Sequence, residues 1–290
     1  MKLLITGATG FVGRHVAQAS LAKGHQVTGI VRSSDQAKTL KAQDIESVVS
    51  DLSETDLLRQ LTRASDGVVH AAAANSPDWE ETNHRVVTTF LDALEDTGKP
   101  LAMQGGTMVF GDTGASPLAE EAATFNGPPP LQGRIALERQ FLEASQRGIR
   151  PLMIYGSYVY GGSGAAIPSI MKAAAQSSGY SAYVGEGANG WASVHIRDWA
   201  DLFVLALENP QAQGAYFAAT EVNSLKEIAT IIDEATEQSS GTRSVSPEQA
   251  QALWSFFSQP LSFMNQRFSA EKAITTLGWH PKYSLEASTL

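Results

Sequence analysis

Three glycines close to the N-terminus have a spacing that suits the binding of a phosphate group. Gly7, Gly10 and Gly13 follow an expected strand at residues 2–6, whose centre is the apolar run 3–5, and they open an Ala-rich stretch that ends near Lys23. In a strand-turn-helix unit the first glycine permits the sharp turn, the second lets a pyrophosphate approach the backbone, and the third lets the helix pack on the strand. The N–H groups at the start of the helix then face the anion. The loop predicts a dinucleotide site formed by Gly7, Thr9, Gly10, Phe11, Val12 and Gly13.

The residues after the next expected strand, 26–31, select between the two nicotinamide dinucleotides. An acidic side chain there accepts hydrogen bonds from a free ribose 2′-hydroxyl, whereas an arginine with neighbouring hydroxyls suits a 2′-phosphate. Here Arg32 and Ser33 follow the strand. We therefore predict NADP(H) as the preferred cofactor. NAD(H) stays open as an alternative, because the Asp35 carboxylate could reach the ribose.

Short apolar runs alternate with helical patterns along the first half of the chain. Strands are expected at residues 2–6, 26–31, 45–49, 67–73, 101–110 and 152–155. Helices are expected at residues 11–23, 56–61, 83–97 and 134–146. This alternation predicts an α/β fold with a doubly wound parallel sheet that helices cover on both faces.

Beyond Tyr155 glycine-rich punctuation replaces the regular alternation. We assign residues 1–155 to a dinucleotide-binding domain and 156–290 mainly to a smaller C-terminal substrate-binding lobe. A strand and a helix within 197–236 are expected to return to the main sheet. Residues 239–246 are expected to form a solvated loop.

The composition narrows the classes of function. Of the 290 residues, 21 are Lys or Arg and 30 are Asp or Glu, so the net charge of −9 disfavours nucleic acid and anionic membrane as partners. The chain has no cysteine, which excludes disulfides, a thiolate nucleophile and Cys-ligated metal. The histidines are too scattered to predict a metal site. Because no signal peptide or membrane span is recognisable, we expect a cytoplasmic protein.

The glycine loop and several later motifs resemble the short-chain dehydrogenase/reductase superfamily. The resemblance is to its extended or atypical branch, which includes NAD(P)-dependent nucleotide-sugar epimerases and dehydratases. The matching segments are residues 51–52, 68–73, 109–111, 159–161, 194–198 and 277–281, so the likeness runs along nearly the whole chain. The resemblance implies a Rossmann fold, a small-molecule substrate and a monomer or homodimer. It also implies that Asp51 and Leu52 border the adenine and that Ala71, Ala72 and Ala73 line the cofactor groove.

The Tyr-x-x-x-Lys pair that moves the proton in most of the superfamily is absent from this sequence. Alignment with that stretch puts Gln132 in the tyrosine position and Ala136 in the lysine position. The helper Ser/Thr is replaced by residues 105–106, both glycine, with Thr107 beside them. Thr107 and Gln132 are therefore retained as catalytic candidates, and Arg134 could contact the cofactor in place of the lysine.

Aromatic residues after the sixth expected strand are further candidates. Tyr155 and Tyr158 lie where ligands collect in open α/β sheets, and each is either a proton donor or an aromatic wall. By resemblance, Tyr160, Trp191 and His195 are expected to line the substrate pocket. For His195 the alternative is a hydrogen-bonded core histidine.

These features predict an atypical NADP-dependent oxidoreductase that acts on a small organic carbonyl or an activated alkene. The proton would come from a non-standard residue or from water. A sugar-nucleotide epimerase is less expected, because oxidation of a secondary alcohol needs a base. Two alternatives stay open, namely an NADP(H)-binding sensor or regulator without catalysis and a non-redox lyase or isomerase on the same fold.

Overall fold

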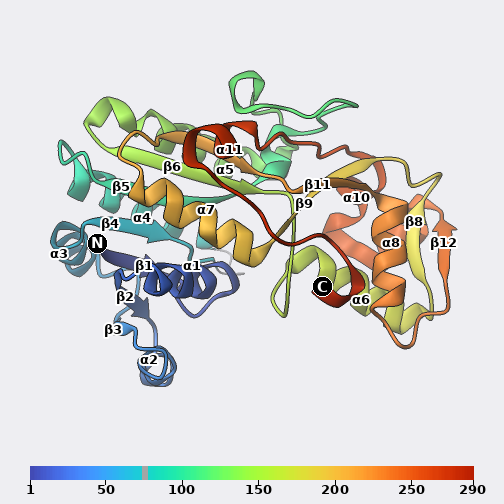
Figure 1. The fold of residues 1–290 in the computed structure, drawn as a ribbon, viewed down its shortest axis with the longest axis horizontal. Helices are drawn as coiled ribbons and strands as arrows, with labels where there is room; N and C mark the ends of the chain where they lie inside the picture. Colours follow the sequence, from blue (N-terminus) through green and yellow to red (C-terminus); the bar gives the residue numbers. More distant parts are fainter. Residues whose placement is uncertain (74–77) are drawn as a thin grey trace.

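The computed structural model describes residues 1–73 and 78–290 and has an α/β architecture (Figure 1). Its centre is a seven-stranded sheet of order β10-β6-β5-β4-β1-β2-β3, in which every neighbouring pair is parallel. The strands are β1 (Lys2–Thr6), β2 (Gln26–Val31), β3 (Glu46–Val49), β4 (Gly67–His70), β5 (Pro100–Gly106), β6 (Arg150–Gly156) and β10 (Gly214–Ala218). The predicted doubly wound fold is confirmed. The strand order reverses between β1 and β4, the point at which such sheets bind ligands.

Both faces of the sheet are covered, because its central strands carry apolar residues on both sides. Leu3 and Ile5 of β1 are buried in one core cluster and Leu4 in another, as alternation along a strand requires. The first cluster is completed by α1 (Phe11–Ala22), α7 (Ile196–Glu208) and α11 (Glu271–Leu277). The second is completed by α3 (Thr55–Ala64), α4 (Trp79–Leu94) and α5 (Gln132–Leu142). The short α2 (Ser34–Lys41) packs beside β2 and β3.

A smaller lobe lies beside one end of the sheet (Figure 1). It contains a three-stranded sheet, β7 (Tyr158–Tyr160), β9 (Gly190–His195) and β11 (Glu221–Ser224), and a parallel pair, β8 (Ser181–Val184) and β12 (Thr242–Val245). Its helices are α6 (Ala166–Ser178), α8 (Leu225–Glu234), α9 (Pro247–Trp254) and α10 (Ser258–Phe263). As predicted, a strand near residue 215 returns to the main sheet, where β10 pairs with β6. The boundary at residue 155 stays a prediction.

Several segments differ from the expected elements. The strand predicted at 67–73 ends at His70. The strand predicted at 101–110 ends at Gly106, and a 3-10 turn (Thr107–Phe110) follows it. The loop predicted at 239–246 contains β12, because pairing with β8 satisfies its backbone and buries Val245. In the described ranges no helix is long and apolar enough to cross a membrane.

Candidate functional site

The glycine loop joins β1 to α1 at the strand-order reversal. Gly7 has a φ of +72°, and a Cβ there would stand 2.6 Å from the carbonyl oxygen of Ala71. A Cβ on Gly13 would stand 2.2 Å from the Gly7 oxygen. Gly10 is the N-cap of α1 and no side chain caps it, so the first-turn N–H groups of Phe11 and Val12 have no partner in the helix. This open cradle with unpaired N–H groups fits a pyrophosphate.

Arg32 lies exposed after β2, and its guanidinium makes no hydrogen bond or ion pair with the described residues. Ser33 caps α2 by accepting a hydrogen bond from the Gln36 N–H. The alternative ligand Asp35 forms an ion pair with Lys38 at 2.9 Å on the helix surface. Of the two candidates, Arg32 is therefore the one with a free charged group.

Asp51 and the alanines lie around the same loop. The Ser53 N–H, and more weakly the Arg32 charge, hold the pKa of the Asp51 carboxyl below its usual range. Ala71 continues β4, with its N–H donated to the Thr6 oxygen, and Ala72 and Ala73 face a cavity. The expected cofactor groove thus has Asp51 on the Arg32 side and the alanines next to Gly7.

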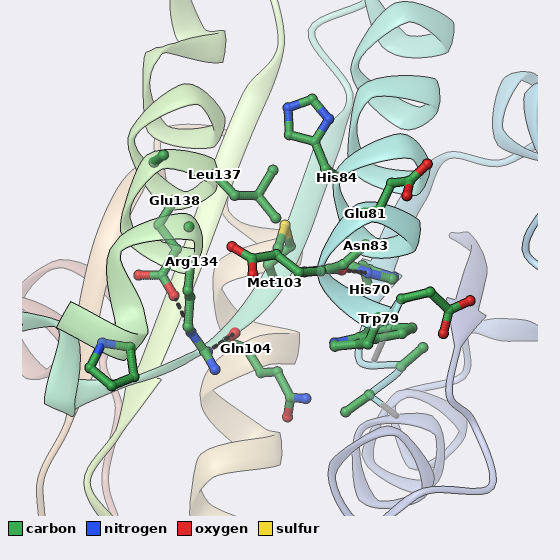
Figure 2. A pocket seen from close by; sticks show the side chains of 17 residues that line it. His70, Trp79, Glu81, Asn83, His84, Met103, Gln104, Arg134, Leu137 and Glu138 are labelled. Carbon is green, nitrogen blue, oxygen red and sulfur yellow. Dashed lines mark hydrogen bonds and ion pairs between the residues drawn. The ribbon is translucent and has the colours of Figure 1, made fainter. Parts of the chain in front are cut away.

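A cavity of about 740 Å³ opens beside this loop, between the carboxyl ends of β4 and β5 and the first turns of α4 and α5 (Figure 2). His70, Trp79, Gln104, Arg134 and Glu138 are among its lining residues. Arg134 is the only lysine or arginine among the lining residues that the structure describes. The cavity thus places one cation next to the expected cofactor groove, in a lining that also contains the carboxylates of Asp78, Glu80, Glu81 and Glu138.

Arg134 belongs to a hydrogen-bonded chain that is buried at Glu138 and Tyr155. Glu138, one turn along α5, accepts from Arg134 Nε at 2.7 Å and from the Tyr155 hydroxyl at 2.7 Å. Its side chain is only 2% exposed, against 44% for Arg134. Burial raises the pKa of the Glu138 carboxyl, and the Arg134 charge opposes that rise. Both carboxylate oxygens are thereby occupied, and the guanidinium is held at the cavity wall.

His70 is a structural histidine at the cavity floor. Its Nδ1 is 2.6 Å from Thr6 Oγ1 and its Nε2 is 2.7 Å from Asn83 Oδ1. Because the amide oxygen only accepts, Nε2 carries the proton and Nδ1 accepts from the threonine hydroxyl. Burial lowers the pKa of His70 to about 4. It is neutral at pH 7 and supplies no charge to the cavity.

None of the four catalytic candidates from the sequence lines this cavity. The Thr107 hydroxyl is buried and donates to Gln266, while the exposed Gln132 donates to the Gly127 carbonyl. Tyr155 and Tyr158 are fully buried, and burial raises the pKa of both. Tyr158 is shut in against Met171, and the interpretation of the two tyrosines as proton donors stays a prediction.

The expected substrate-lining residues also lie in the interior. Trp191 and Tyr160 are buried in the core of the smaller lobe, where the Tyr160 hydroxyl donates to the Tyr283 carbonyl. His195 accepts from the Arg197 N–H as the N-cap of α7 and stacks on Tyr283 at 4.0 Å. These contacts agree with the alternative that His195 is a hydrogen-bonded core histidine. Packing contacts within the lobe involve all three side chains, and their lining roles stay predictions.

Sequence reasoning missed the Arg134–Glu138–Tyr155 chain. Its signal is the four-residue spacing of Arg134 and Glu138, which places both side chains on one face of a helix. Nothing local connects that pair to Tyr155, which is on a neighbouring strand. In the described residues no group of three His, Asp or Glu side chains is placed to hold a metal ion.

Comparisons with known proteins agree with this architecture. The sequence model of the NAD dependent epimerase/dehydratase family matches residues 3–219. The chain is 32% identical to the uncharacterized protein C2A9.02 of Schizosaccharomyces pombe, covering 98% of this chain and 96% of that protein. It is 26% identical to a UDP-glucose 4-epimerase of Mycolicibacterium smegmatis, covering 98% and 95%.

A UDP-glucose 4-epimerase from Stenotrophomonas maltophila, solved with bound NAD and formylated UDP-arabinopyranose, shares the fold. The TM-score is 0.79 at 19% identity, over 100% of this chain and 95% of that one. A dTDP-glucose 4,6-dehydratase from Bacillus anthracis in complex with NAD has a TM-score of 0.78 at 17% identity, over 99% and 93%. The chain thus belongs to the NAD dependent epimerase/dehydratase family, whose members are NAD(P)-dependent enzymes of the epimerase, dehydratase and reductase type.

Proposed function

We propose that this protein is an NADP(H)-dependent oxidoreductase that acts on a small organic carbonyl or an activated alkene. The observation that carries the proposal is the open glycine cradle at the strand-order reversal, with the free Arg32 guanidinium at one end and a cavity at the other. A cytoplasmic monomer or homodimer is part of the same proposal.

The residues present fit a nicotinamide dinucleotide. The N–H groups of Phe11 and Val12 would hold its pyrophosphate, and Arg32 would pair with the 2′-phosphate. Asp51 and Leu52 would border the adenine. Once bound, the dinucleotide supplies or accepts a hydride.

NADP(H) is favoured over NAD(H) by the charges at the end of β2. Arg32 offers a guanidinium fork, whereas the Asp35 carboxylate is already paired with Lys38. Several structural neighbours hold NAD, so the proposed preference for NADP(H) rests on this chain's own residues alone.

A second candidate, an NADP(H)-binding sensor or regulator, is favoured by one observation. None of the four catalytic candidates from the sequence lines the cavity. A sensor needs only cofactor binding and a conformational response, whereas the enzyme also needs a group at the cavity that acts on the substrate oxygen.

Calorimetric titration of NADPH and NADH tests the cofactor part of the proposal. We expect NADPH to bind at least 10-fold more tightly than NADH, and Arg32→Ala to remove the preference, because a charge-assisted hydrogen bond contributes about 1.5–3 kcal/mol. Arg63→Ala is the matched control, since Arg63 is exposed at the end of α3 that leads into the amino end of β4. Equal affinities in the wild-type protein would refute the NADP preference, and absence of binding would refute both candidates.

A further inference from the structure

The carboxyl end of β5 lacks side chains where the family resemblance places a hydroxyl. Gly105 and Gly106 stand there, and Arg134 reaches the site from α5, with Nη2 3.5 Å from the Gln104 carbonyl oxygen. A Cβ on Gly106 would stand 3.9 Å from the same Nη2, so a longer side chain would meet the guanidinium. A Cβ alone at 106 would make an ordinary contact with the guanidinium, so only a side chain longer than alanine would compete with Arg134 for this space.

The other glycine, Gly105, makes room for Tyr155, whose hydroxyl contacts the carboxylate that holds Arg134. A Cβ on Gly105 would stand 2.2 Å from the Tyr155 ring, so the ring packs there only against glycine. The Tyr155 hydroxyl then reaches Glu138, and Glu138 holds Arg134 Nε. The two glycines, the tyrosine, the glutamate and the arginine form one linked set.

The guanidinium keeps donors available to the cavity. Arginine has five N–H donors, and the described residues accept from two of its nitrogens, Nε and Nη2. Arg134 is 44% exposed, and Figure 2 shows its guanidinium between Glu138 and Gln104, at the wall of the cavity. The Nη1 group and the second Nη2 hydrogen therefore have no acceptor in the described part of the chain.

We propose that Arg134 stabilises the negative charge that develops on the substrate oxygen during reduction, and that Glu138 and Tyr155 are its positioning residues. This inference rests on the proposed function. Bound NADPH would supply a hydride to the carbonyl carbon or to the β-carbon of an enone, and the substrate oxygen would take up the displaced π electrons as an alkoxide or enolate, which the Arg134 N–H groups would hold. The products are NADP⁺ and, after water donates one proton, the alcohol or the saturated carbonyl compound.

This role explains how the site works without the tyrosine. Arginine does not release its proton near neutral pH, but two N–H groups of a fixed guanidinium fork stabilise an oxyanion by charge-assisted hydrogen bonds. Donors aimed at a developing oxyanion contribute about 10²–10³-fold in kcat. Because the cavity is open, water reaches the oxygen to protonate it.

Binding of benzoate, whose carboxylate mimics the oxyanion, tests the donor site without catalysis. We expect calorimetry, at a temperature at which both proteins are folded, to show benzoate binding to the wild-type protein and at least 10-fold weaker binding to Arg134→Ala, with NADPH affinity retained. The melting temperature of Arg134→Ala is expected to fall, because the buried Glu138 carboxylate loses its charged partner. Arg139→Ala is the matched control, because Arg139 lies on the same helix but is exposed over the Phe125 ring. Glu138→Gln, which keeps the shape of the side chain, is expected to weaken binding by a smaller factor. No binding to the wild-type protein, or equal binding to Arg134→Ala, overturns the proposal.

Kinetics with NADPH and two carbonyl probes, 4-nitrobenzaldehyde and cyclohex-2-enone, test the catalytic role. Arg134→Ala is expected to lower kcat about 10²–10³-fold with little change in KM, and guanidinium chloride added to this variant is expected to restore part of the rate. An unchanged kcat, or a loss that guanidinium does not rescue, overturns the role. If NADPH fails to bind the wild-type protein, the proposed function fails, while the benzoate titration still decides whether the donor site exists.

Discussion

The variant Gly10→Ala distinguishes two requirements for glycine in the loop, namely close packing of the backbone and close approach of the pyrophosphate. Gly10 has an ordinary φ of −78°, and an added Cβ would approach only the Gly7 oxygen, at 3.1 Å. Because the normal C···O contact is about 3.3–3.6 Å, a shift of a few tenths of an ångström accommodates the methyl group. We expect the free energy of unfolding to change by less than about 1 kcal/mol. NADPH binding is expected to fall at least 10-fold, because the pyrophosphate must approach the backbone at this glycine.

Gly13→Ala is the matched variant in which the added methyl group would overlap the Gly7 backbone. Its added Cβ would stand 2.2 Å from the Gly7 oxygen and 2.7 Å from the Gly7 carbonyl carbon. The start of α1 must then move away from the turn by about 1 Å to restore a normal contact. Overpacking of this kind costs about 1–3 kcal/mol. We expect this variant to lose both stability and NADPH binding.

Urea unfolding and NADPH calorimetry on the two variants provide the comparison. The expected pattern is native stability with weak binding for Gly10→Ala, and reduced stability with weak binding for Gly13→Ala. Normal NADPH binding by Gly10→Ala would refute the placement of the pyrophosphate at this turn. Equal destabilisation of both variants would refute the packing argument.

Two further predictions concern stability. Tyr155→Phe removes the donor to one buried Glu138 oxygen and is expected to lower the free energy of unfolding by about 1–3 kcal/mol in urea; a variant as stable as the wild-type protein would contradict the role of that hydrogen bond. The pKa of His70 is about 4 in the folded protein and 6.5 in the unfolded chain. The unfolded state therefore binds more protons as the pH falls. The contribution of His70 to the free energy of unfolding is full above pH 6.5 and falls by up to about 3 kcal/mol between pH 6.5 and pH 4. Urea unfolding at pH 7 and pH 5 checks this, and His70→Gln should show a smaller loss; an equal loss in that variant would assign the pH dependence to other groups.

The sheet and the glycine loop were predictable because their signals are local. A strand that is buried on both faces is an unbroken apolar run, as at Leu3, Leu4 and Ile5. The positive φ of Gly7 and its close approach to the Ala71 oxygen admit only glycine. These requirements are met within a few residues of sequence, and the pattern therefore predicts them.

The positions of the tyrosines were not predictable from their neighbours in sequence. Tyr155 and Tyr158 lie at or just beyond the end of β6, where a side chain faces either a ligand or the core. Their surroundings are set by Glu138 and Met171, which are distant in sequence. Likewise, pairing with β8 turns residues 242–245 into a strand, although their composition is that of a loop.

The Arg134–Glu138 pair is poorly explained by stability alone. Burying a carboxylate costs several kcal/mol, and apolar side chains of similar volume often stabilise a protein as well as a buried ion pair does. Here the buried partner is Glu138, whereas Arg134 is nearly half exposed and lies at the cavity wall. If the glycine loop no longer bound a cofactor, the fold would not need a buried carboxylate that holds an arginine here, since apolar side chains could fill the adjoining cavity. The burial of Glu138 therefore favours the proposed active site over a loop that has lost its function, because Glu138 holds the Arg134 guanidinium where a substrate oxygen would lie.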